Sequence, residues 1–174
     1  MREKPGDAYQ RYVEARLGMF QRLAYMLCQD RTRADDLVQD ALERLYLKWE
    51  KADDARNTDA YARTILVRVF LSERRTPWAR RVVLVDRLPD SAAATGPDTV
   101  SAVAVRGALA RLAPRQRAVL VLRYFSDLSV DEVAETLGCS PGTVKSQTSK
   151  GLATLRRALP DFEAAPQSGL RTRS

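Results

Sequence analysis

The chain has 174 residues, 45% of them hydrophobic, and a formal net charge of +7. This length and hydrophobic content suffice for one or two folded domains and exclude a disordered chain. The excess of cations favours a polyanionic partner, with nucleic acid ahead of a membrane surface. Histidine is absent, and the two cysteines, Cys28 and Cys139, stand alone. Histidine-dependent catalysis and zinc sites of the usual spacing are therefore excluded.

These features predict a cytoplasmic protein that needs no cofactor or metal. The cysteines are expected to be small core residues in a reducing compartment. The sequence opens without a secretory signal, and none of its apolar runs reaches membrane-spanning length. We accordingly expect no membrane partner.

Residues 7–78 are predicted to be helical, because apolar residues recur at three- and four-residue spacing. Breaks are expected at residues 30–33 and within residues 51–59, where Asn57 or Thr58 is a suitable N-cap. Prolines, a glycine and small polar residues then indicate a flexible linker.

Helical patterning resumes near Pro97 and continues to Leu159. The predicted fold is all-α, with two small helical modules joined by a flexible linker. The expected divisions are residues 7–80 and 101–160 for the modules, 81–100 for the linker and 161–174 for a disordered tail.

The segment ADDLVQDALERLYLKWE presents an acidic helix face in a basic protein. Asp36, Gln39, Asp40 and Glu43 lie opposite its apolar stripe, with Leu47 beside them. An apolar anchor inside a charged rim is typical of a protein-docking surface. Taken alone, however, a solvated face with one exposed leucine is the commoner explanation.

The next predicted helix, residues 59–75, is apolar on nearly all sides. Arg63 and Thr64 share one side with Val67, and Arg74, Arg75 and Trp78 follow at its end. Cations interleaved with aromatic residues suit single-stranded nucleic acid, on which exposed bases stack. A buried helix whose basic end complements its dipole is an equally good interpretation.

The segment LSVDEVAETLGCSPGTVKSQTSKGLATLRRAL has the pattern of a helix-turn-helix. Ser129 and Glu132 form a capping box, and Gly138 suits the left-handed residue that ends the first helix. Ser140 then caps a second, longer helix with Pro141 in its first turn. A short helix, a glycine-containing turn and a longer helix are the order of this DNA-binding motif.

The second helix of this pair has one face without acidic residues. At about 100° per residue, Val144, Gly151, Leu152 and Leu155 fall on one side. Lys145, Ser146, Ser149, Lys150 and Arg156 fall on the other side. Solvated helix faces usually mix both signs of charge. The pattern therefore predicts contact with phosphates and base edges.

The preceding helix, PRQRAVLVLRYFSD, is expected to pack Val119, Leu120, Leu122 and Phe125 into the core. Whether Arg115, Arg117 and Arg123 on this helix share the DNA face or meet a protein partner is left open by the sequence.

The chain resembles a known family over residues 8–160. The stretches RLAYMLCQDRTRADDLVQDALERLYLKW and AYARTILVRVFLSERR, followed after the linker by LAPRQRAVLVLRYFSDLSVDEVAETLGCSPGTVKSQTSKGLATLRRAL, resemble RNA polymerase sigma factors. The resemblance is to the compact extracytoplasmic-function (ECF, group IV) type, which keeps conserved regions two and four. The segments SERRTPWARR and YFSDLSVDEVAETLGCSPGTVKSQTSKGLATLR look most like the SigE-like subfamily.

The resemblance implies a protein that binds core RNA polymerase and directs it to promoter DNA, and that is associated with the nucleoid in the holoenzyme. The acidic face would dock on the β′ clamp helices, and the helix around residues 114–125 would meet the β flap. Many members are also held inactive by an anti-sigma factor. The implied contacts with polymerase are Asp36, Gln39, Asp40, Glu43 and Leu47.

The resemblance also implies two promoter contacts. Region two would bind the melted minus-ten strand, with a base flipped into a pocket, and region four would read the minus-thirty-five duplex. Arg68 stands where many members have an asparagine. The promoter contact of that asparagine is therefore not transferred to Arg68. The implied minus-ten residues are Arg56, Asn57, Arg63, Thr64, Val67, Arg68, Arg74, Arg75 and Trp78. The implied minus-thirty-five residues are Ser140, Thr143, Lys145, Ser146, Ser149, Lys150 and Arg156.

Two alternatives compete with a sigma factor. A helix-turn-helix regulator acting without polymerase would explain the C-terminal half, but it would leave the acidic face unexplained. A nucleic-acid enzyme would need carboxylates that hold a metal, and Asp35, Asp36 and Asp40 are the only dense set. We expect a protein that is not an enzyme and has no catalytic residues.

Overall fold

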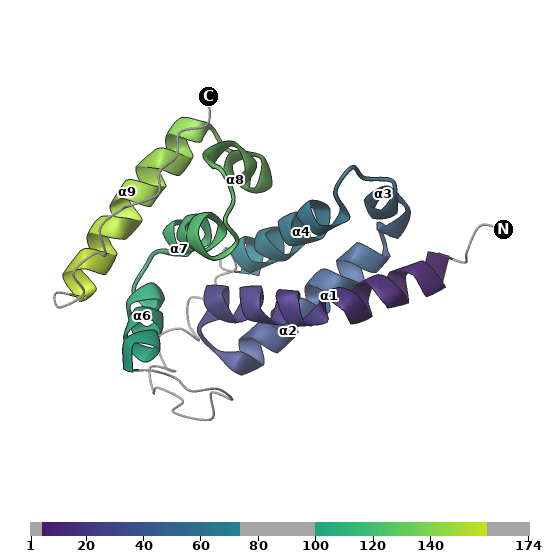
Figure 1. The fold of residues 1–174 in the computed structure, drawn as a ribbon, viewed down its shortest axis with the longest axis horizontal. Coiled ribbons are helices and arrows are strands. Elements are labelled where there is room, and N and C mark those ends of the chain that lie inside the picture. Colours follow the sequence, from purple (N-terminus) through teal and green to yellow (C-terminus); the bar gives the residue numbers. More distant parts are fainter. Residues whose placement is uncertain (1–4, 74–99, 160–174) are drawn as a thin grey trace.

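The structure is a computed structural model that describes residues 5–73 and 100–159 (Figure 1). Every secondary-structure element in these two ranges is a helix, which confirms the all-α prediction. Residues 81–99 of the predicted linker and the predicted tail lie outside the described residues, as do Arg74, Arg75 and Trp78. Within the described ranges, no helix is both long and apolar enough to cross a membrane.

The N-terminal module consists of α1 (Pro5–Cys28), α2 (Arg31–Tyr46), α3 (Trp49–Asp53) and α4 (Thr58–Glu73). The carboxylate of Asp30 caps α2 by accepting the Arg33 N–H at 2.8 Å. The Asn57 side chain accepts the Ala60 N–H at 3.0 Å. Asn57 is therefore an N-cap of α4, as predicted.

The sequence pattern predicts one helix over residues 34–50, whereas the structure divides this segment into two helices. The chain leaves α2 after Tyr46, turns at Leu47 and Lys48, and continues as the short α3. Trp49 is still buried, against the rings of Tyr9 and Tyr12 at centroid distances of 5.4 and 5.2 Å. The apolar pattern continues through the turn, so periodicity alone did not reveal it.

The C-terminal module consists of α6 (Val100–Ala110), α7 (Pro114–Leu120), the π-helical turn η1 (Val121–Phe125), α8 (Val130–Leu137) and α9 (Pro141–Ala158). The capping box of Ser129 and Glu132 is present in full. Gly138 has φ 63° and ψ 45°, the left-handed conformation predicted for it. The Ser140 side chain accepts the Thr143 N–H at 3.1 Å and starts α9.

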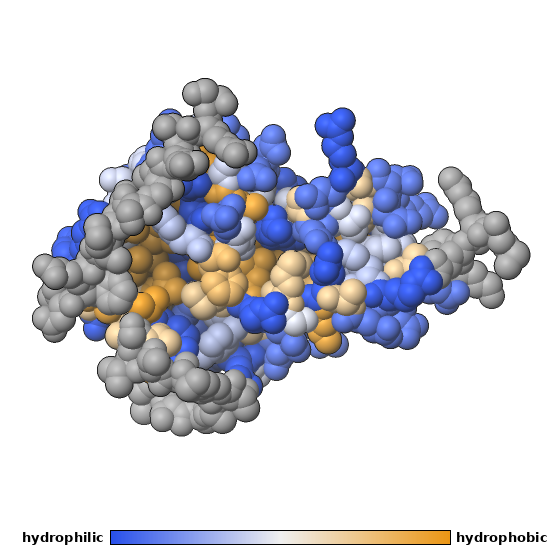
Figure 2. All heavy atoms as spheres, in the orientation of Figure 1, coloured by the Kyte–Doolittle hydropathy of each residue, from blue (hydrophilic) through white to orange (hydrophobic). Residues whose placement is uncertain are grey.

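The two modules pack against each other, which the sequence did not predict. Helix α4 contacts α7 and α8, and α1 contacts η1, α6 and α7. Phe20 and Leu66 belong to the same cluster of buried residues as Val119 and Val133. In Figure 2, apolar residues gather in the middle of the visible face, around the place where the modules meet.

Candidate nucleic-acid and polymerase interfaces

Helix α9 has the two faces that its sequence predicts. Val144 and Gly151 are buried, and Leu152 and Leu155 are partly buried against the C-terminal core of Leu109, Leu112 and Leu120. The opposite face is exposed at Lys145, Ser146, Ser149, Lys150 and Arg156. Ser140 is also exposed and Thr143 is partly buried, because both take part in the cap of the helix. The structure thus brings the predicted recognition residues onto one end and one side of α9.

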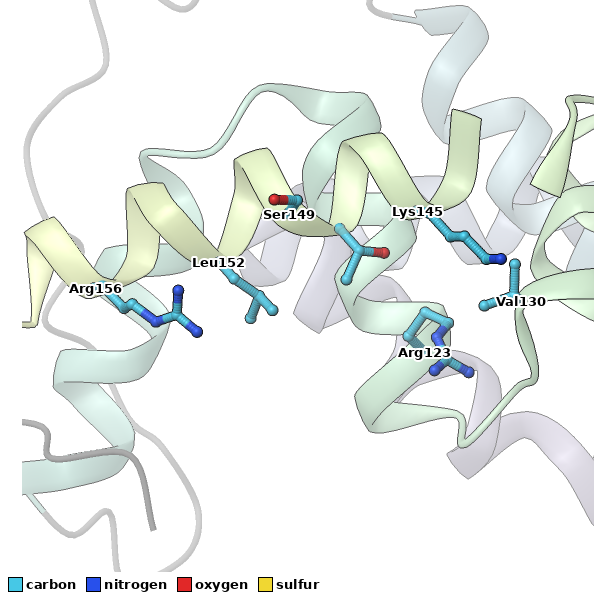
Figure 3. Close-up of a pocket in the computed structure, with 7 residues that line it drawn as sticks. Arg123, Val130, Lys145, Ser149, Leu152 and Arg156 are labelled. Atoms are coloured by element: carbon cyan, nitrogen blue, oxygen red, sulfur yellow. The ribbon is translucent and has the colours of Figure 1, made fainter. Parts of the chain in front are cut away.

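A cationic hollow of about 320 Å³ lies beside this face (Figure 3). Lys145 and Arg156 line it from α9, together with Ser149, and Arg123 lines it from η1. The Arg123 guanidinium is oriented by donation from Nη1 to the Leu128 carbonyl. Its buried Nε has no hydrogen-bond partner. Three cations beside the exposed Ser149 hydroxyl are suited to a phosphate group.

The three arginines of residues 114–125 have three different environments. Arg115 is exposed, and Arg123 lines the cationic hollow. Arg117 is only 3% exposed and therefore cannot contact DNA in this structure. Sequence reasoning left these positions undecided because all three are arginines on one helical segment.

Phe125, which the sequence places in the core, is 47% exposed. The π-helical turn explains the difference. In η1 the backbone hydrogen bond runs from the Ser126 N–H to the Val121 carbonyl, at 3.0 Å. The wider turn rotates the following side chains relative to an α-helix, so the 3.6-residue pattern no longer gives their direction.

The acidic face of α2 is exposed throughout. Asp36, Gln39, Asp40 and Glu43 all lie at the surface. Leu47, at the end of the helix, is 81% exposed. Tyr46 beside it is 56% exposed and packs edge-on against Tyr9, with ring centroids 5.0 Å apart. Sequence reasoning missed Tyr46, although its place next to Leu47 was a signal that this apolar surface is larger than one residue.

The start of α4 is held in place by side chains from α1. The Asp59 carboxylate accepts the Tyr12 hydroxyl at 2.9 Å and pairs with the Arg16 Nε at 3.0 Å. Burial, followed by the hydrogen bond to Asp59, raises the pKa of Tyr12 above its ordinary value. These contacts hold the first turn of α4 against α1.

The predicted minus-ten residues do not all share one environment. Arg56, Asn57 and Arg68 are exposed, whereas Arg63 and Thr64 are partly buried. The Thr64 hydroxyl donates to the Ala60 carbonyl at 2.9 Å. Val67 is 0% exposed, so it lies in the core and not at the surface in this structure.

The described residues contain no group of three or more potential metal ligands, so Asp35, Asp36 and Asp40 do not form a cluster suited to a metal. Cys28 is buried, in line with its expected role in the core, and Cys139 is partly buried.

Comparison with known proteins identifies both modules. Residues 12–81 match the family model for sigma-70 region 2, and residues 102–155 match that for sigma-70, region 4. The RNA polymerase sigma-E factor of Streptomyces coelicolor is 37% identical over 156 residues, covering 87% of this chain and 85% of that protein. The ECF RNA polymerase sigma factor SigL of Mycobacterium tuberculosis is 32% identical over 146 residues, covering 81% and 82% respectively.

A solved structure is also similar. The sigma factor RpoE of Bartonella quintana, in complex with the anti-sigma factor NepR, superposes with a TM-score of 0.71 at 26% identity. The match covers 90% of this chain and 99% of that one.

A region 2 module followed by a region 4 module defines a sigma factor, a class of protein that is not an enzyme. With these relatives, the chain belongs to the extracytoplasmic-function sigma factors, which direct transcription initiation by RNA polymerase.

Proposed function

We propose that this sigma factor binds its promoter through two separate surfaces and core polymerase through a third. The exposed face of α9 reads the minus-thirty-five duplex. The exposed residues of α4 and of the loop before it bind the melted minus-ten strand. The acidic face of α2, with Leu47, docks on the β′ clamp helices.

The observation that carries the proposal is the composition of the α9 surface. Helix α9 contains no acidic residue, and its cations and the hydroxyls of Ser146 and Ser149 lie on the exposed side. The Arg123 guanidinium extends this surface across the hollow to η1. A rigid helix with hydroxyls between cations supplies both base-edge and phosphate contacts in a major groove. Arg123 thereby joins the residues proposed to contact DNA.

The strand-binding surface is supported by exposed cations near the start and middle of α4. Arg56 precedes the helix, and Arg68 projects from it into solvent. An arginine at this position supplies a phosphate contact or stacks on an exposed base. A minus-ten preference different from that of members with asparagine here is the expected consequence.

The docking surface is supported by its combination of charge and apolar area. Leu47 and Tyr46 are large exposed apolar side chains within an acidic surface. In a protein of net charge +7, such a surface repels DNA and suits a basic protein surface.

An anti-sigma factor is a further proposed partner. It is supported by the family resemblance and by the Bartonella quintana relative, which was solved with the anti-sigma factor NepR.

The proposal for α9 is tested by duplex binding at several salt concentrations. The slope of log K against log salt is negative, and in Lys145→Ala and Lys150→Ala each lost phosphate contact should reduce its magnitude by about 0.9. Lys48→Ala is the matched control, because Lys48 is an exposed lysine of the N-terminal module. A slope unchanged in both α9 variants would contradict the assigned DNA surface.

A further inference from the structure

The loop of residues 54–57 joins α3 to α4 (Figure 1). It carries Arg56 and Asn57, two exposed residues of the proposed strand-binding surface. The Thr58 hydroxyl donates to the Ala52 carbonyl at 3.1 Å, so a hydrogen bond closes the loop at its base. A loop whose ends are held presents its side chains in one geometry, and base selection depends on such a fixed geometry.

Tyr12 of α1 contacts the helices on both sides of this loop. Its ring packs on that of Trp49 in α3, with the ring centroids 5.2 Å apart. Its hydroxyl donates to the Asp59 carboxylate of α4 at 2.9 Å. The ring also lies beside the buried Phe20, at a centroid distance of 6.3 Å, so the side chain is held against the core. One rigid side chain thereby fixes the first turn of α4 relative to α3.

The Asp59 carboxylate has a second donor from α1. The Arg16 Nε lies 3.0 Å from Oδ1 and 3.1 Å from Oδ2 of Asp59. The two side chains are 46% and 31% exposed, and ion pairs so open to solvent contribute little free energy because water and salt screen them. The position of Asp59 therefore depends most on the partly buried Tyr12 hydroxyl.

We propose that Tyr12 is a positioning residue for promoter recognition: by joining α3 to the first turn of α4, it holds the loop of residues 54–57 in the geometry that selects bases of the melted minus-ten strand. The inference rests on the proposed strand-binding role of this loop. In this role Tyr12 acts through Trp49 and Asp59 and does not itself contact DNA.

The inference is tested with holoenzyme assembled from core polymerase and the full-length chain. The probe is a fork DNA with a duplex upstream element and the minus-ten element as a single-stranded overhang, in the sequence that the parent holoenzyme selects. Base preference is the ratio of the affinities for this overhang and for one with a substituted base. Tyr12→Phe keeps the ring on Trp49 and removes the hydroxyl, so we expect it to lower this ratio by about fivefold.

Tyr9→Phe is the matched control. Tyr9 also packs on Trp49, at a centroid distance of 5.4 Å, but its hydroxyl donates to the Leu42 carbonyl of α2. This variant should keep the base preference of the parent, and both variants should bind polymerase and the upstream duplex as the parent does.

A double-mutant cycle identifies the group through which the hydroxyl acts. In a chain that carries Asp59→Ala, the Tyr12 hydroxyl has already lost its acceptor. Tyr12→Phe should then change the base preference no further.

An unchanged ratio in Tyr12→Phe would overturn the positioning role and leave the proposed strand-binding surface standing. An equal fall in Tyr9→Phe, or loss of polymerase binding by Tyr12→Phe, would show a general effect on the fold and would overturn the role as well. Additive effects of Tyr12→Phe and Asp59→Ala would overturn the assigned route through Asp59. If the parent holoenzyme has no base preference in the overhang, the proposed function fails, and this inference with it.

Discussion

Arg117 is a buried cation that donates to backbone carbonyls of both modules. In the sequence it is one of three arginines on a short segment, and nothing in their spacing separates it from Arg115 or Arg123. Its environment depends on the distant residue Leu27, which only tertiary packing brings close. This is why sequence reasoning left its role open.

Gly151 of α9 lies so close to α7 that a side chain at this position would collide with Leu120. A Cβ at this residue would lie 2.9 Å from Cδ1 and 3.2 Å from Cγ of Leu120, which is itself 3% exposed. The absence of a side chain therefore allows α9 to approach α7 closely. Sequence analysis placed Gly151 on the inner face of α9, but it could not supply this distance.

We expect Gly151→Ala to lower the free energy of unfolding by about 1–2 kcal/mol, because the overpacking cost exceeds the gain in helix propensity. Gly107→Ala in α6 is the matched control, since its added Cβ meets nothing within 4 Å. That variant should be more stable by about 1 kcal/mol. Urea denaturation measures both, and stabilisation by the two substitutions alike would contradict the close packing at Gly151.

Among the elements, the helix-turn-helix was predicted most completely. Its caps and its turn depend on local interactions between residues at most four apart, such as Ser129 with Glu132 and Ser140 with Thr143. The turn between α2 and α3 and the π-helical turn η1 were not predicted, because neither interrupts the apolar pattern. Phe125 was placed in the core for that reason.

The capping box makes the start of α8 sensitive to acid. The Glu132 carboxylate accepts the Ser129 N–H at 2.7 Å, and this hydrogen bond lowers the pKa of Glu132 in the folded chain. A lowered folded-state pKa stabilises the fold above the unfolded-state pKa, and this contribution is lost as pH falls through the folded value.

We therefore expect the stability difference between the parent and Glu132→Gln to be constant near neutral pH. It should shrink below the ordinary glutamate pKa of about 4.3. Denaturation at a series of pH values measures it. A difference independent of pH down to full protonation would show that the carboxylate charge contributes nothing to the cap.

The docking face of α2 is tested by Asp40→Ala combined with Leu47→Ala. Loss of an apolar anchor and of a rim charge should weaken binding to core polymerase by about tenfold or more. Glu14→Ala, an exposed acidic residue of α1, is the control. Duplex binding should be unchanged in both, and full polymerase affinity in the double variant would remove α2 from the interface.

At the scale of the whole molecule, two helical modules were predictable from periodicity and from the composition between them. Their packing was not, because it joins residues such as Leu27 and Arg117 that are far apart in sequence. Val67, which the resemblance placed on the strand-binding surface, is buried in the structure. Sequence thus predicted the surfaces of each module better than the relation between the modules.

The division of promoter reading between the modules is tested most directly by sequencing the promoters used by reconstituted holoenzyme. A library randomised at two upstream elements is transcribed with core polymerase and either the parent chain or Ser146→Ala, whose side chain is exposed on α9. We expect the parent to select bases in both elements and Ser146→Ala to relax selection only in the element farther from the start site. A variant whose preference changes in the nearer element, or a parent that selects no sequence at all, would contradict the account.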